Sequence, residues 1–134
     1  MSDSTLPPVN PKWMTWTGWV LSVLPVLMLV MSGVMKIRQP KEVVEGFGHL
    51  GYSMDSAMVL AVIELGCTLI YVIPQTAVLG AILLTGYLGG ATATHLRVGD
   101  PIGQIITPVI MGVVVWLGLY LREPRLRALI PWRR

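Results

Sequence analysis

The chain has 134 residues, of which 54% are hydrophobic and only 13% are charged. Soluble domains carry about 25% charged residues, so this composition excludes an ordinary soluble domain and indicates a membrane protein. The net charge is +3, with the basic excess near the C-terminal end. That excess fits anionic lipid headgroups rather than nucleic acid, because no stretch rich in Arg and Lys with interleaved aromatic residues is present.

Four mostly apolar stretches follow one another, at residues 16–35, 56–73, 76–95 and 102–121. Each has close to the roughly 20 residues that a helix needs to cross a bilayer. The sequence therefore predicts an all-α integral membrane four-helix bundle whose transmembrane domain covers residues 16–121. The very short Pro74-Gln75 connection makes the second and third spans antiparallel neighbours.

Three segments outside the spans differ in composition, and each predicts a different structure. Residues 1–15 are polar and hold three prolines, which predicts a flexible N-terminal tail. Residues 41–50 place Val43, Val44 and Phe47 at helical spacing, which predicts a short amphipathic helix over the bundle mouth between the first two spans. Residues 122–134 combine five arginines with apolar residues, which predicts a basic tail at the membrane interface.

Both termini are expected on one side of the membrane, because the chain crosses it four times. That side carries six basic residues, namely Lys12, Arg122, Arg125, Arg127, Arg133 and Arg134. The opposite side carries four, namely Lys36, Arg38, Lys41 and Arg97. Basic residues are enriched in cytoplasmic segments, so we predict that both termini are cytoplasmic.

Glu64 lies near the middle of the second span. An ionisable side chain at membrane depth is costly unless it is paired, neutralised or hydrated, so Glu64 is expected to face the bundle interior. Lys36 ends the first span on the side where the second begins, about 12 Å from Glu64 along the membrane normal at about 1.5 Å per residue. The two long side chains can cover much of that gap, directly or through water.

Other polar residues are expected to join Glu64 in a polar wedge that opens away from the termini. Glu64 forms its base, and Lys36, His95 and Arg97 line its mouth. Ser32 lies one helical turn from Lys36, and Tyr87 and Thr85 lie near the depth of Glu64. These seven residues are the predicted ligand-binding set. His95 has no second His or Cys at ligand spacing, so no metal site is predicted.

The third span carries Gly86 and Gly90 in a GxxxG pattern, with Thr94 on the same face. Small residues at this spacing allow two helices to approach closely. The pattern leaves two interpretations open, which are tight packing within one chain and contact between two chains of a homodimer.

Several short motifs carry a family resemblance. Ser32-Gly33-Val34-Met35-Lys36 closes the first span, and Val44-Glu45-Gly46-Phe47 and Leu50-Gly51-Tyr52 lie in the loop after it. The later motifs are Ile63-Glu64-Leu65, Ile73-Pro74-Gln75-Thr76 with residues 77–81, residues 85–91, His95-Leu96-Arg97 and Asp100-Pro101. With these motifs the chain resembles the DoxX-like family of small four-helix membrane proteins. The resemblance implies a multi-pass protein of a bacterial cytoplasmic (inner) membrane. Relatives linked to quinone-coupled oxidation imply a bound quinone or a redox partner protein, because the chain itself has no evident cofactor ligand set.

Several functions remain open from the sequence. The first is binding of a hydrophobic small molecule (a quinone or a lipid-like molecule) around Glu64, as an accessory subunit of a membrane redox system. The second is a membrane enzyme of isomerase, epoxide-opening or cyclase type, in which Glu64, with Lys36 or His95, acts as general acid or base. A proton-coupled transporter is a third, and a purely structural ion pair between Glu64 and Lys36 or Arg97 is the alternative to any site.

Overall fold

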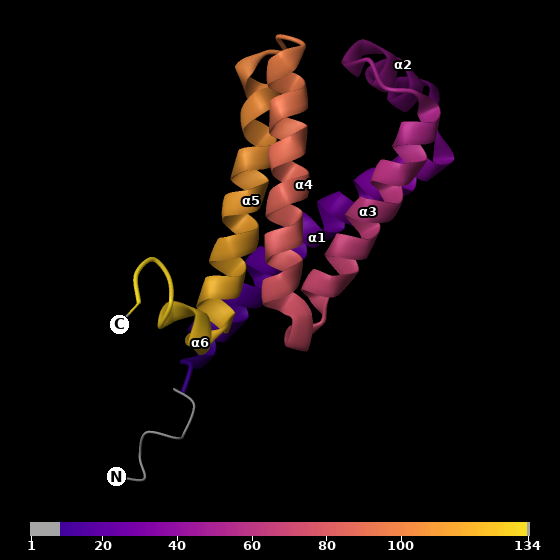
Figure 1. The fold of residues 1–134 in the computed structure, drawn as a ribbon. Coiled ribbons are helices and arrows are strands. Elements are labelled where there is room, and N and C mark those ends of the chain that lie inside the picture. Colours follow the sequence, from indigo (N-terminus) through magenta and orange to yellow (C-terminus); the bar gives the residue numbers. More distant parts are fainter. Residues whose placement is uncertain (1–8, 134) are drawn as a thin grey trace.

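The computed structural model describes residues 9–133, which form six α-helices and one 3₁₀ turn (Figure 1). In chain order the elements are α1 (Lys12–Arg38), α2 (Lys41–Leu50), α3 (Met54–Val72), η2 (Pro74–Thr76), α4 (Ala77–Arg97), α5 (Ile102–Arg122) and α6 (Pro124–Arg127). The prediction of a four-helix membrane bundle is confirmed, because α1, α3, α5 and the segment from η2 through α4 are each long and apolar enough to cross a bilayer.

The boundaries differ from the predicted spans mainly at the N-terminal side. Helix α1 begins at Lys12 and continues to Arg38, so it takes in the last residues of the segment that was predicted to be a flexible tail. Residues 1–8 of that segment and Arg134 lie outside the described residues. The predicted amphipathic helix at 41–50 is confirmed as α2, whose one buried side chain is Phe47. It ends at Leu50 and is followed by Gly51, where φ is +81°, a backbone conformation that glycine adopts without steric cost.

The four long helices pack in a ring. Helix α1 packs against α3 and α5, and α4 packs against the same two helices from the other side. In Figure 1, α4 and α5 run side by side, whereas α1 and α3 lean away from them toward the upper end, where α2 lies. The start of α1 and helix α6 lie together at the lower end.

Glycines allow the helices to approach closely at the lower end. A Cβ atom on Gly118 of α5 would lie 2.6 Å from the Ser22 hydroxyl of α1, and one on Gly80 of α4 would collide with the backbone of Tyr71 in α3. The Tyr71 hydroxyl lies 2.9 Å from Ser22 Oγ and 2.8 Å from the Val115 carbonyl oxygen, so it connects three helices within the core. The helices therefore meet tightly below and separate above, which leaves space for a site.

Candidate functional site

A cavity of about 540 Å³ occupies the space where the helices separate. It lies beneath α2 and is lined by residues of α1, α2, α3, α4 and α5. Most of its wall is apolar. The polar side chains that line it are Ser32, Lys36, Tyr52, Glu64, Tyr87, Thr94, His95 and Thr107.

A buried ion pair lies in this cavity. The ammonium nitrogen of Lys36 lies 2.7 Å from Glu64 Oε2 and donates a second hydrogen bond of 2.6 Å to Ser32 Oγ, one turn back on α1. The Glu64 side chain is only 2% exposed, and that of Lys36 is 14% exposed. The pair is therefore direct, and it satisfies the requirement that an ionisable group at membrane depth has a partner.

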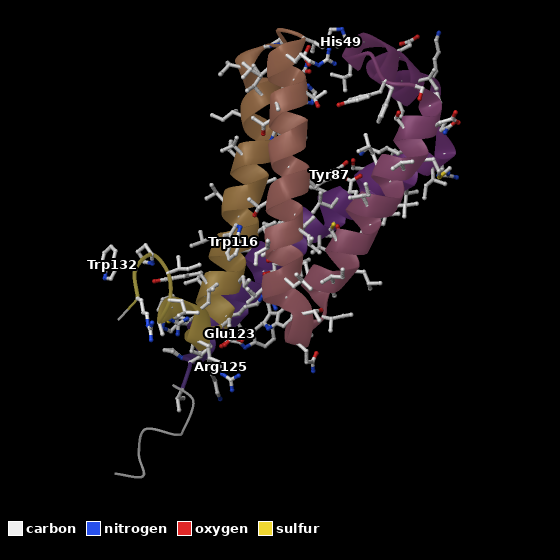
Figure 2. All side chains as sticks on the ribbon, in the orientation of Figure 1. His49, Tyr87, Trp116, Glu123, Arg125 and Trp132 are labelled. Carbon is white, nitrogen blue, oxygen red and sulfur yellow. The ribbon has the colours of Figure 1, made fainter. Side chains whose placement is uncertain are left out.

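Tyr87 approaches the same carboxylate from the opposite helix. It extends from α4 toward α3 (Figure 2) and lines the same cavity as Glu64. Three protonatable side chains, Lys36, Glu64 and Tyr87, thus share one end of a largely apolar space.

A second polar cluster closes the upper end of the cavity. The Asp100 carboxylate lies between two imidazoles, with His49 Nε2 2.6 Å from Oδ1 and His95 Nδ1 2.6 Å from Oδ2. His49 belongs to α2, His95 to the end of α4, and Asp100 to the turn before α5. Figure 2 shows His49 at this upper junction. We call this cluster the His49–Asp100–His95 latch.

The two imidazoles of the latch change the pKa of Asp100. The hydrogen bonds from His95 and His49 hold the pKa of the Asp100 carboxyl below its ordinary value.

Two further contacts join the same elements. The Tyr52 hydroxyl lies 2.9 Å from Thr94 Oγ1, and the Arg97 guanidinium donates to the carbonyl oxygen of Leu50. Helix α2 is therefore attached to α4 as a cover over the cavity.

The model of the DoxX-like family matches residues 20–118 of the chain. The chain belongs to the DoxX-like family. The match includes every residue that lines the cavity, since these extend from Met28 to Met111. Neither the comparison with curated proteins nor the comparison with solved structures finds a match.

Five of the predicted site residues lie together in this DoxX-like protein. Glu64, Lys36, Ser32, Tyr87 and His95 all line the one cavity. Within it, His95 contacts Asp100 rather than Glu64, so it belongs to the cover and not to the ion pair.

The other two predicted residues point elsewhere. Thr85 lies on the outer side of α4, where its hydroxyl donates to the Ala81 carbonyl and accepts a 2.6 Å hydrogen bond from the indole of Trp116. Thr85 and Tyr87 are two positions apart, which turns them to nearly opposite faces of a helix. For the same reason Arg97 departs from the face of His95, so that it is exposed and bonds to Leu50 of α2 without lining the cavity.

The GxxxG pair has a different role from helix packing within the chain. Gly86 and Gly90 both line the cavity, and a Cβ atom at either would meet no atom within 4 Å. The interpretation of close intramolecular packing through this pair is therefore wrong. The glycines instead widen the cavity on its α4 side.

Sequence reasoning did not find the roles of His49, Tyr52 and Asp100. His49 and Asp100 are separated by 51 positions, so no local spacing connects them. The pattern of α2 did contain a signal. Its apolar face had to pack against the bundle, and His49 in its last turn was a polar residue able to attach the helix there. Among residues 9–133 no group of His, Cys, Asp or Glu side chains is arranged to hold a metal ion.

Proposed function

We propose that this DoxX-like protein binds a membrane-dissolved hydrophobic small molecule, a quinone or a lipid-like molecule, in the cavity beside Glu64. The observation that carries the proposal is the combination of a buried Lys36–Glu64 pair with a mostly apolar cavity of about 540 Å³. Ligand sites are typically apolar spaces with a few convergent polar groups that fix orientation.

The wall of the cavity supports a ligand with an apolar body and one polar end. Leu29, Leu60, Ile63 and Met111 supply apolar surface along its length. Lys36 and the Tyr87 hydroxyl are donors at one end, suited to a carbonyl or hydroxyl oxygen of the ligand. Intramembrane ionisable residues are rare, and a functional site is the default explanation for them.

The proposal also includes the membrane in which the protein lies and the orientation of its termini. We infer a multi-pass protein of a bacterial inner membrane with both termini cytoplasmic. The basic residues Lys12, Arg122, Arg125 and Arg127 belong to the start of α1, the end of α5 and α6, which lie at the end opposite α2 (Figure 1). A quinone ligand would suit an accessory subunit that contacts a redox partner protein or a second copy of the chain.

The test is to identify small molecules that remain bound after purification in mild detergent. Lipid extracts of the wild type, Glu64→Gln and Asp55→Asn are compared by mass spectrometry. Asp55 is the matched control, because it is an exposed carboxylate in the first turn of the same helix. We expect one molecule that follows the wild type and Asp55→Asn and is lost from Glu64→Gln. A molecule retained equally by all three would contradict a site at Glu64.

A second candidate is a membrane enzyme that uses Glu64 as general acid or base on a lipophilic substrate. The observation that favours it is that Lys36, Glu64 and Tyr87 line one cavity, where each could exchange a proton with a bound ligand. Isomerisation, epoxide opening and cyclisation each require proton transfer in a shaped apolar space.

This candidate is tested with the bound molecule itself. The protein is incubated with it in D₂O and, separately, in water labelled with ¹⁸O, and the molecule is weighed by mass spectrometry. Deuterium uptake reports isomerisation or cyclisation, and ¹⁸O uptake reports epoxide opening by water. Uptake with the wild type and Asp55→Asn but not with Glu64→Gln is the expected result. No uptake above the protein-free rate would exclude these reactions on that molecule and leave binding alone.

A further inference from the structure

A second hollow lies on the outer face of the α4–α5 pair. This groove has a volume of about 600 Å³ and contains Gly89 on α4 and Gly112 and Val113 on α5. Only Leu88 and Pro108 belong to the walls of both the groove and the Glu64 cavity, so the two spaces are different. The C-terminal tail closes the lower end of the groove.

The polar groups along the groove are satisfied within the protein. The Thr85 hydroxyl donates to Ala81 and accepts from Trp116, and the Thr92 hydroxyl donates a 2.9 Å hydrogen bond to the Leu88 carbonyl. The rest of the wall is almost entirely apolar. Such a groove has no group that needs a polar ligand, and it suits a hydrocarbon chain.

The lower end of the groove, unlike the rest of its wall, is next to polar and basic residues. Tyr120 lines it there, and its carbonyl oxygen accepts a 2.9 Å hydrogen bond from the Arg127 guanidinium. Among residues 9–133 the Tyr120 hydroxyl has no hydrogen-bond partner. Leu126 and Ile130 of the tail complete this end, and Arg125 and Arg127 flank Leu126 in the sequence. Figure 2 shows Trp116 on α5 and, farther down the chain, Trp132 on the tail that lies beside it.

The arginines of the tail carry positive charge without acidic partners. Within the described part of the chain, none of them forms an ion pair with a carboxylate. The one nearby acid, Glu123, accepts a hydrogen bond from the backbone N–H of Arg125 at 3.1 Å rather than from its guanidinium. Arg125 and Arg133 are exposed. This end therefore complements an anionic group at the membrane interface.

We propose that the α4–α5 groove holds one acyl chain of an anionic phospholipid, whose phosphate is bound by the exposed tail arginines and the Tyr120 hydroxyl. The lipid is the occupant that matches both ends, since one end is apolar along the depth of the membrane and the other is basic at its surface. An uncharged protein partner would match the apolar groove but would offer no anionic group to the arginines. The inference is independent of the ligand proposed for the Glu64 cavity.

The test measures which lipids the full-length protein retains. The protein is equilibrated in nanodiscs of equal phosphatidylglycerol and phosphatidylcholine, released into mild detergent, and weighed by native mass spectrometry. We expect one retained phosphatidylglycerol. Arg125→Gln combined with Arg133→Gln should reduce the retained fraction by at least about fivefold, the loss expected for one basic residue near anionic lipid. Arg38→Gln, an exposed arginine at the other end of the bundle, is the matched control.

A second variant tests the groove itself. Gly89→Leu fills the groove without a clash, since a Cβ atom there meets no atom within 4 Å. Gly103→Leu adds the same side chain at an equally open position of α5 that lines neither space. Loss of the retained lipid from Gly89→Leu but not from Gly103→Leu is expected. Equal retention by both variants, or equal retention of the two lipids by the wild type, would overturn the proposal.

Discussion

Replacing Lys36 by methionine removes the positive charge from the cavity while keeping a long side chain. The Glu64 carboxylate, 2% exposed, then loses the ammonium group that lies 2.7 Å from it. Breaking a buried ion pair by removing one partner typically costs about 3–5 kcal/mol of unfolding free energy, because the remaining charge stays buried without compensation. Since the Lys36 side chain is 14% exposed, the pair is not completely buried. We therefore expect a loss at the lower end of this range, about 3 kcal/mol.

The assay is reversible unfolding by sodium dodecyl sulfate in mixed micelles at pH 7, followed by far-UV circular dichroism. Lys41→Met is the control, because Lys41 forms a surface pair with Glu45 at 3.8 Å and is 85% exposed. An exposed pair of this kind contributes about 0.5 kcal/mol at most. Lys36→Met and Lys41→Met should therefore differ clearly in the same measurement.

The double variant Lys36→Met with Glu64→Gln removes both charges. We expect it to be more stable than Lys36→Met alone by about 2 kcal/mol, because no uncompensated charge remains buried. If the losses of the two single variants simply add in the double variant, the two side chains are not coupled. That result would refute the reasoning from the ion pair.

Three further outcomes follow from the geometry. Because hydrogen bonds hold the pKa of Asp100 below its ordinary value, the latch is stabilising above pH 3.8 and is lost as the pH falls through the lowered value. The protection factors of the α2 amides, which are corrected for the pH dependence of intrinsic exchange, should thus stay constant from pH 7 to pH 5 and fall below pH 3.8, whereas Asp100→Asn should lower them already at pH 7. Gly80→Ala should lower the unfolding free energy by about 1–3 kcal/mol, since the added methyl group collides with the α3 backbone, while Gly86→Ala should leave it unchanged or raise it, as measured in the same detergent titration. Tyr71→Phe should cost about 1–2 kcal/mol in that titration through the loss of a fully buried hydroxyl that bonds to two helices.

Much of the fold could be predicted because the bilayer imposes strong constraints on sequence. Four apolar stretches of membrane-spanning length leave few alternatives to a helical bundle, and the short turn at Pro74 fixes two of the helices as neighbours. That Glu64 has a basic partner could also be predicted, since a carboxylate at this depth needs one, but the sequence left Lys36 and Arg97 open as that partner. Helix α2 followed from apolar spacing alone, despite its glycines.

The remaining features depend on how the helices lean, which local sequence does not encode. Gly80 and Gly86 look alike in the sequence, yet one meets the backbone of α3 and the other faces empty space. The latch depends on α2 lying over the α4–α5 turn, which brings His49 next to Asp100. Each of these outcomes is decided by tertiary packing between residues far apart in the chain.

The most direct test of the central claim is to fill the cavity without touching its polar groups. Gly90→Leu places a side chain in the cavity, and Gly66→Leu adds the same bulk on α3 outside it; neither has an atom within 4 Å of the new Cβ. The amount of bound small molecule per protein is then measured by mass spectrometry for both variants and the wild type. A ligand in the cavity predicts that Gly90→Leu loses the molecule while Gly66→Leu keeps it. Retention of the molecule by Gly90→Leu at the wild-type level would contradict the claim that this cavity is the binding site.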